Sequence, residues 1–328
     1  MSNKIEAIKS NAEKLCFTRF IINFPIGSQI SFGRMTINSQ IYRLPGEADN
    51  LEQIIESEIK NNKDSARISN KGREMDKISG IPFSSSDPRF LHLLGIVGTY
   101  NYSIHTFVKL DKDIYILETP GLDKDFVKKA LESDTQVAKS LTSQKQFQIP
   151  NTPGMCIDHA FSSIEPTFEN IEFGIRLKVF PDVHFSVQTI KNGDGVIPVN
   201  LAHEKSESMK QGMTSGLETW LSRLKTLREG KRVVSDWHGE EMLLRVPGGF
   251  GKPSIHKFIF RASGLPHDPL HPFVELTMDS GVEGNQTASR EPSLSDEEAL
   301  ALWDWLLNSI QVRPNAVAHR SEIPQPNE

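Results

Sequence analysis

Between residues 169 and 189 the sequence alternates between apolar and polar side chains, and this alternation constrains the fold more than any other feature. The apolar set before the turn is Ile171, Phe173, Ile175, Leu177 and Val179. After the turn residues Phe180-Pro181-Asp182, the apolar set resumes with Val183, Phe185 and Val187. Because successive side chains of a strand point to opposite faces, this period of two predicts an antiparallel hairpin with one buried face.

Other apolar runs predict further strands and helices. We expect strands near residues 17–24, 29–33, 35–44, 103–109, 112–119, 231–236, 239–246, 254–262 and 272–279. Helices are expected over residues 5–15, from Asn50 to residues 61–62, over 126–141, from about 206 to 229 with a stop at Gly230, and at the end of the chain. Ser295 and Glu298 have the spacing of a capping box for that closing helix.

These elements predict an α+β fold with two domains, each an antiparallel sheet built from hairpins with helices packed on one face. A length of 328 residues suits two domains of ordinary size. The segment 148–154 contains Pro150, Pro153 and Gly154 and has the composition of a linker. We therefore expect domains at 1–150 and 151–313 and a disordered tail at 314–328.

The charge distribution argues against nucleic acid and membranes as partners. Residues 1–150 carry 20 Lys and Arg against 18 Asp and Glu, and residues 151–328 carry 17 against 24. The second part is therefore acidic, which favours neither nucleic acid nor an anionic membrane. No run reaches the roughly 18 apolar residues of a membrane span, so we expect no membrane insertion.

The motifs of common enzymes are missing from the sequence. There is no Gly-x-Ser-x-Gly nucleophile elbow. The segment 248–254 superficially resembles a phosphate-binding loop, but Val246 takes the place of the first glycine and Pro253 that of the hydroxyl residue. We therefore expect a binding protein without catalytic residues or a cofactor.

One histidine-rich segment keeps a second function open. His256, His267 and His271 lie close in sequence to Asp268, and imidazole and carboxylate are suitable zinc ligands. Three prolines around them favour a rigid loop between strands over a metal site. The alternative is a metal-dependent enzyme or metal-binding protein that uses histidines of residues 256–271.

Two cysteines, Cys16 and Cys156, exclude a disulfide framework and a thiolate metal cluster. A bridge between them would be possible in an oxidising compartment. We favour two free thiols buried at strand starts, because free cysteine is commonly buried.

Three segments together resemble the type VI secretion lipase immunity proteins, specifically the class that neutralises the fourth class of Tle phospholipase effectors. They are Cys16–Pro25, the stretch from Gly154–Asp158 into the hairpin at 180–189, and Ser293–Asp304. The segments lie at both ends and in the middle, so the resemblance covers nearly the whole chain. Asn23 departs from the pattern, because an acidic residue is expected there.

The resemblance implies an immunity protein that binds a cognate Tle phospholipase, an α/β-hydrolase, clamps its lid and blocks the catalytic cleft. It also implies the periplasm, although the first residues lack the apolar region of a signal peptide and leave the cytoplasm open. Aromatic side chains often dominate protein interfaces. Our candidate loop anchors for the partner are Phe83, Phe90, Tyr100, Tyr102, Trp237 and Phe250.

Overall fold

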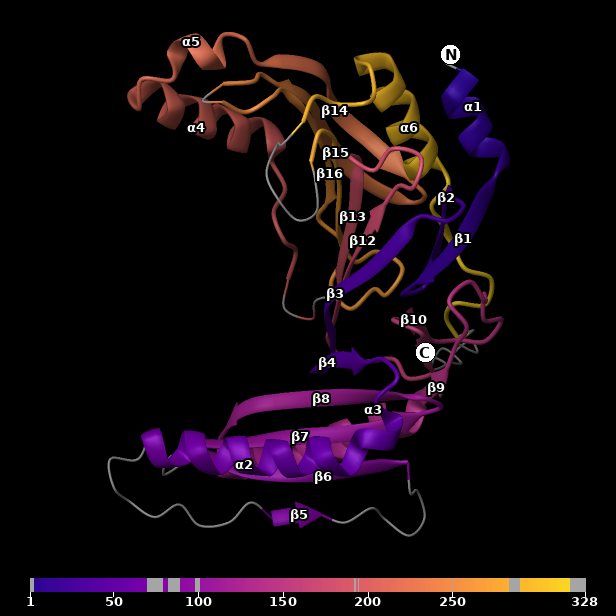
Figure 1. Cartoon of the computed structure of the whole chain (residues 1–328), viewed down its shortest axis with the longest axis vertical. Coiled ribbons are helices and arrows are strands. Elements are labelled where there is room, and N and C mark those ends of the chain that lie inside the picture. Colours follow the sequence, from indigo (N-terminus) through magenta and orange to yellow (C-terminus); the bar gives the residue numbers. More distant parts are fainter. Residues whose placement is uncertain are drawn as a thin grey trace, which may run out of the picture. The chain divides into compact units, whose positions relative to one another are not determined.

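The structure is a computed structural model that describes residues 3–69, 79–81, 89–97, 101–191, 193, 195–249, 251–282 and 290–318. Its internal contacts define two compact units (Figure 1). Unit 1 comprises residues 1–33, 146–154 and 170–328, and unit 2 comprises 34–145 and 155–169. Each unit thus takes residues from both sides of the predicted linker. The division of the chain into domains at residue 150 stays a prediction.

Unit 1 is built on a sheet with the strand order β14-β15-β16-β17-β13-β12, followed by the first residues of β3. Pairing is antiparallel from β14 to β13. The strands are β14 (Lys225–Val234), β15 (Trp237–Val246), β16 (Ile255–Ala262), β17 (Phe273–Asp279), β13 (His184–Lys191), β12 (Glu169–Arg176) and β3 (Gln29–Ile37). The predicted strands in these regions are confirmed.

The predicted hairpin is formed by β12 and β13, whose side chains alternate between buried and partly exposed positions. Phe173, Phe185 and Val187 are buried in the core of unit 1. Val179 is the exception to the predicted apolar face, because it lies in the turn and is 53% exposed. We call the face of this sheet that carries Phe173 and Phe185 the inner face, and the opposite one the outer face.

The inner face is covered by elements from both ends of the chain. These are α1 (Asn3–Ser10), α6 (Asp296–Asn308) and a three-stranded sheet of β1 (Ala12–Phe17), β2 (Phe20–Pro25) and β18 (Gln311–Val312). The capping box of α6 is confirmed: the Ser295 side chain accepts from Glu298 N, and Ser295 N donates to Glu298. The first helix is shorter than predicted, because Leu15 packs in the same core from strand β1.

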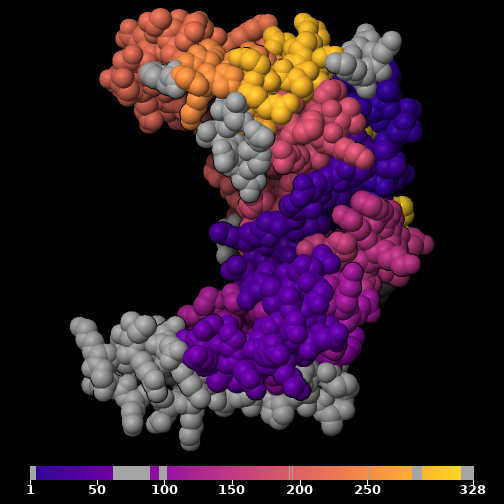
Figure 2. Space-filling view, viewed as in Figure 1, coloured from indigo at the N-terminus to yellow at the C-terminus, as the bar shows by residue number. Residues whose placement is uncertain are grey.

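The outer face carries α4 (Leu201–Thr214), which is followed by the short helix α5 (Glu218–Leu221). The single helix predicted over 206–229 is therefore wrong. Gly216 adopts a φ of +77°, which ends the helix, and the chain enters β14 at Lys225. A Cβ at Gly212 would lie 2.8 Å from Leu221 Cδ1, so Gly212 allows α5 to pack closely on α4. Figure 2 shows the α4–α5 region in orange-red and the closing segment in yellow on the surface of unit 1.

Unit 2 contains the strand order β4-β8-β7-β6-β5, which adjoins the end of β3. The strands are β4 (Ser39–Leu44), β8 (Asp113–Leu122), β7 (Asn101–Leu110), β6 (Phe90–Val97) and β5 (Ser79–Ile81). Three short strands form a second sheet: β9 (Leu141–Ser143), β10 (Met155–Ile157) and β11 (Ala160–Ser162). A short 3-10 helix, η1 (Ala48–Asn50), leads into α2 (Leu51–Ser69), which continues beyond its predicted end, and α3 spans Lys124–Ser140.

Helices cover both faces of the sheet of unit 2. α2 packs on Leu93, Phe107 and Ile116, whereas Asp134 of α3 accepts hydrogen bonds from Thr106 and Thr119. Phe107 and Thr106 are consecutive in β7 and therefore point to opposite faces. The α+β class with antiparallel sheets is confirmed, but the helices are not confined to one face.

The segment after α6 is anchored in unit 1. Arg313 is buried and donates to the backbone carbonyls of Pro150, Thr152 and Gly154, and Ala316 is also buried. The predicted disorder therefore does not hold for the residues up to Ala316, and residues 319–328 lie outside the described part. Among the described residues, no helix is long and apolar enough to cross a membrane.

Candidate functional site

The candidate loop aromatics have different environments. Trp237 is only 2% exposed, packs edge-on against Phe20 and donates from Nε1 to the Leu270 carbonyl at 3.0 Å. Phe90 is buried beside His92. Neither residue lies on the surface as a loop anchor would, because both fill the protein interior. Tyr102 is half-buried in β7. Phe83, Tyr100 and Phe250 lie outside the described residues. The proposed contacts of all six aromatic residues with a partner stay a prediction.

The histidines of residues 256–271 bind different partners. His271 Nδ1 lies 2.8 Å from Asp268 Oδ2, in the loop between β16 and β17. His256 is buried and instead contacts Ser280 and Asp296. His267 lies in that loop with a φ of +60°, next to Gly193. In the described part of the chain, no group of three or more His, Cys, Asp or Glu residues could hold a metal ion.

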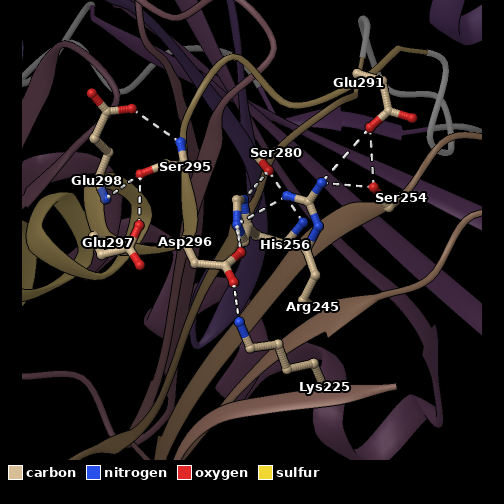
Figure 3. A network of polar contacts seen from close by, with 10 residues as sticks. All are labelled: Lys225, Arg245, Ser254, His256, Ser280, Glu291, Ser295, Asp296, Glu297 and Glu298. Carbon is tan, nitrogen blue, oxygen red and sulfur yellow. Dashed lines mark hydrogen bonds and ion pairs between the residues drawn. The ribbon is translucent and has the colours of Figure 1, made fainter. Parts of the chain in front are cut away.

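One polar cluster of unit 1 surrounds His256 (Figure 3). Its Nδ1 lies 2.7 Å from Ser280 Oγ, and its Nε2 lies 3.0 Å from Asp296 Oδ1 and 3.1 Å from Arg245 Nη1. Asp296 also accepts from Lys225 Nζ at 2.6 Å. Burial lowers the pKa of His256, although Asp296 opposes the shift. The pKa of Asp296 is also lowered, because hydrogen bonds from Lys225 and His256 outweigh its own burial. A neutral His256 beside an ionised Asp296 is therefore the favoured state.

This arrangement contains the residue types of a Ser-His-Asp triad, yet its geometry is structural. Ser280 and His256 are both 0% exposed, so a substrate could not reach the hydroxyl. Ser280 Oγ also accepts from the His256 backbone N at 3.2 Å, and Ser280 N donates to the His256 carbonyl. Asp296 is the first residue of α6 and lies beside the Ser295 capping box. The cluster joins α6 to β15, to β16 and to the residue after β17, and the Ser280 hydroxyl is not accessible as a nucleophile.

A second polar cluster lies on the inner face, where charged side chains from distant segments meet. Glu241 accepts from Arg228 Nε at 2.5 Å, Arg232 Nη1 at 2.8 Å and Trp303 Nε1 at 3.1 Å. Asp304 of α6 accepts from both arginines at 2.6 Å. Hydrogen bonds from the two arginines lower the pKa of Asp304 despite its burial. Each carboxylate is therefore paired, and α6 is fixed to β14 and β15.

Asp182 holds together two distant segments of unit 1, a role that the sequence did not reveal. It is 0% exposed and accepts from Gly281 N at 3.1 Å, from Ser293 N at 3.0 Å and from Ser293 Oγ at 2.5 Å. Hydrogen bonds from Ser293 lower the pKa of Asp182 in spite of its burial. The hairpin turn is thereby tied to the segment before α6. Only its place in a Pro-Asp turn hinted at such a role.

Unit 2 has its own buried carboxyl group, Asp134 of α3. It accepts from Ser39 Oγ, Thr106 Oγ1 and Thr119 Oγ1, and Thr106 in turn contacts His92 at 2.7 Å. Burial raises the pKa of Asp134 and lowers that of His92. Because these partners are neutral hydroxyl groups, the cluster holds α3 against the sheet without an ion pair.

The outer face of unit 1 contains a concavity of about 430 Å³, which we call the outer-face cavity. It is lined by residues 231–233 of β14, 238–240 of β15, Arg261, Ser263 and Val199. A smaller concavity of about 330 Å³ lies farther along the same sheet, over Gly174, Arg176 and His184. Both are open depressions within unit 1.

The two cysteines of the chain, Cys16 and Cys156, are both disulfide-bonded, and neither is a free thiol. The prediction of two free buried thiols is therefore wrong. Both residues are buried, as predicted. Spacing in the sequence could not show which of the two states the chain adopts.

Comparison with known proteins identifies the family. The family model for the Tle cognate immunity protein 4 C-terminal domain matches residues 148–315, which is more than half of the chain. The chain belongs to this family. The matched region contains the β12–β13 hairpin, strands β14 to β17 and α6, and hence most of unit 1. The resemblance inferred from the sequence is confirmed, and the family is one of immunity proteins. No curated protein matches the chain.

Solved structures extend the similarity over almost the whole fold of this immunity family member. The chain is similar to a structure of the Tle4-Tli4 complex, with a TM-score of 0.75 and 23% identity over 94% of this chain and 99% of that chain. It is also similar to the Pseudomonas aeruginosa type VI secretion immunity protein TplEi complexed with "L" peptide, with a TM-score of 0.70 and 23% identity over 93% and 99% of the chains. The apo form of TplEi gives 0.71 and 23% over 93% and 98%. At this identity the comparisons show the shared fold.

Proposed function

We propose that the protein is an immunity protein that binds and inhibits a cognate Tle-type phospholipase effector of a type VI secretion system. The observation that carries the proposal is the family match over residues 148–315. The fold supports it, because the similarity to a chain in the structure of the Tle4-Tli4 complex covers 94% of this chain and 99% of that chain. The partner would be an α/β-hydrolase.

Inhibition would come from binding alone. Lipases open a lid to admit lipid, so a protein that holds the lid over the cleft denies access without chemistry of its own. The environment of His256 agrees with this role, because Ser280 and His256 are sealed from solvent. We propose that the purified protein has no esterase or phospholipase activity. Hydrolysis that disappears in a Ser280→Ala variant would contradict this.

The periplasm is the proposed compartment. Disulfides persist in oxidising spaces such as the bacterial periplasm and are rare in the cytosol. The disulfide-bonded state of Cys16 and Cys156 supports that location. Blocking free thiols in each cell fraction before denaturation tests it: the native protein should be periplasmic and unlabelled. Recovery as a reduced cytosolic protein would overturn the assignment.

The central experiment measures inhibition directly. The probe is a purified cognate lipase of the Tle type, assayed on phospholipid vesicles. Equimolar immunity protein should abolish hydrolysis, whereas an unrelated α/β-hydrolase lipase should keep its activity. Full activity of the cognate lipase in the presence of excess immunity protein would refute the proposed function.

A further inference from the structure

The outer-face cavity combines two features at its end strand β14, and the first is a lysine, Lys231, without a side-chain partner among the described residues. Across β14, β15, β16 and β17, the residues Lys231, Glu240, Arg261 and Glu275 face one another in register. Arg261 is held by Glu275 and by Glu204 of α4, and Glu240 accepts from Leu201 N at 3.0 Å. Lys231, at the end of the row, is exposed and has no ion pair or hydrogen bond to a side chain in the described part of the chain.

The second feature is exposed apolar surface around that cation. Val233, two residues after Lys231 on the same face of β14, is 53% exposed and lines the cavity. Val196 and Leu265, close in sequence to the lining residues Val199 and Ser263, are 52% and 54% exposed. Exposed aliphatic surface at a concavity, as Val233 provides here, is typical of a surface that a partner covers.

The position of the cavity makes it accessible to a chain segment. β14 is the end strand of the described sheet in unit 1, with β15 as its strand neighbour there. α4 and α6 lie on opposite faces of these strands, because Glu240 meets Leu201 whereas the adjacent Glu241 meets Trp303 (Figure 1). The cavity therefore opens beside α4 on the outer face, away from the core and from α6.

We propose that the outer-face cavity is a contact surface for the effector and receives a segment that presents a carboxylate beside an apolar side chain. The carboxylate pairs with Lys231, and the apolar group packs against Val233. This inference rests on the proposed function and deepens it. Charge supports it, because the cavity lining has Lys231, Arg232 and Arg261 against the single carboxylate of Glu240, within an otherwise acidic part of the chain. An excess of cations in the lining favours an acidic segment and speeds its encounter.

The test compares two double variants of the full-length protein. Lys231→Glu combined with Val233→Asp should weaken binding of the cognate lipase about 30-fold or more, the loss expected for a hot spot. The matched control is Lys178→Glu with Val179→Asp, because Lys178 is also exposed and Val179 has the same 53% exposure in the β12–β13 turn. The control should change the dissociation constant less than about threefold.

Two further measurements keep the test decisive. Thermal unfolding shows whether each variant is folded, and the milder pair Lys231→Gln and Val233→Thr replaces the first variant if it is not. The association rate of the wild type should fall with added salt, and Lys231→Gln should reduce that dependence. A salt dependence equal to the wild type would contradict the pairing with a carboxylate.

The outcomes separate this inference from the proposed function. If the wild-type protein neither binds nor inhibits the lipase, the proposed function fails. If the wild type binds and the folded cavity variants bind equally well, the inference alone is overturned. A wild-type dimer in light scattering that the cavity variants convert to a monomer, with lipase binding intact, would assign the cavity to a second copy of this chain and also overturn it.

Discussion

The two faces of the β14–β17 sheet come from the same strands, yet neighbouring charged residues on them differ in burial and in their partners. On the inner face, Glu241 is 6% exposed and accepts from Arg228, Arg232 and Trp303. On the outer face, Glu240 is half-buried, and Lys231 opposite it has no side-chain partner among the described residues. Consecutive residues of one strand therefore differ: Glu241 belongs to a buried cluster that fixes α6, whereas the row of Glu240 ends at the exposed Lys231.

Trp237 should give the largest effect on stability. It fills the inner-face core against Phe20 and Val234. Trp237→Ala should lower the free energy of unfolding by about 4 kcal/mol, because a large cavity is created and the bond to Leu270 is lost. Urea unfolding measures this change, with Val233→Ala on the outer face as the control. A cost below about 1 kcal/mol would mean that the inner face is not the stabilising one.

Glu241 and Glu240 form the most direct comparison of the two faces. Glu241→Gln should cost about 3 kcal/mol, because it leaves two arginines without one of their two carboxylates in a buried cluster. Glu240→Gln should cost about 1 kcal/mol or less, because its amide oxygen can still accept from Leu201 N. Chemical denaturation of both variants gives the difference. Equal losses of unfolding free energy would show that the two faces do not differ in this way.

The sequence predicted the strands of this sheet because their signal is local. Alternation in β12 and β13 depends only on neighbouring residues, and one buried face enforces it. The prediction of one helix over 206–229 is wrong because its apolar residues also suit two shorter helices followed by a strand. The expected stop was Gly230, but Gly216, whose φ is positive, ends the helix.

The polar clusters could not be predicted because their members are far apart in the chain. Arg228 meets Asp304, 76 residues away, and Asp182 meets Ser293, 111 residues away. The residues next to one partner in the sequence do not indicate which distant residue it will contact. Trp237 illustrates a related limit of sequence reasoning: an aromatic residue beside a turn has the same signature whether it points inward or outward.

A further comparison of the two faces uses histidine and the change of folding stability with pH. Burial lowers the pKa of His256 on the inner face, where it is surrounded by Asp296, Arg245 and, through Asp296, Lys225. In the unfolded chain its pKa is near 6.5. As the pH falls below about 6.5, the unfolded state therefore binds a proton that the folded state resists, and stability decreases by up to about 1.4 kcal/mol per pH unit until the folded pKa is reached.

Replacing His256 by Gln should accordingly flatten the pH dependence of stability between about pH 7 and pH 5. His92, His159 and His184 have pKa values lowered by burial as well, so part of the slope should remain. His238 on the outer face is exposed, and His238→Gln is the matched control. Unfolding free energies measured across this pH range decide the matter. A curve for His256→Gln that is parallel to that of the wild type would show that this histidine is not the coupled group.

The smallest effect on stability belongs to the outer-face cavity. Lys231→Gln and Val233→Thr should each change the free energy of unfolding by no more than about 0.5 kcal/mol, because both side chains are exposed and threonine keeps a β-branched shape on the strand. The same substitutions should weaken lipase binding, whereas Glu241→Gln, once its folded fraction is corrected for, should bind normally. Thermal melts and binding titrations on one set of variants therefore test both faces together. If the cavity variants lose stability instead of affinity, Lys231 and Val233 are structural residues, and both faces of the sheet serve the fold.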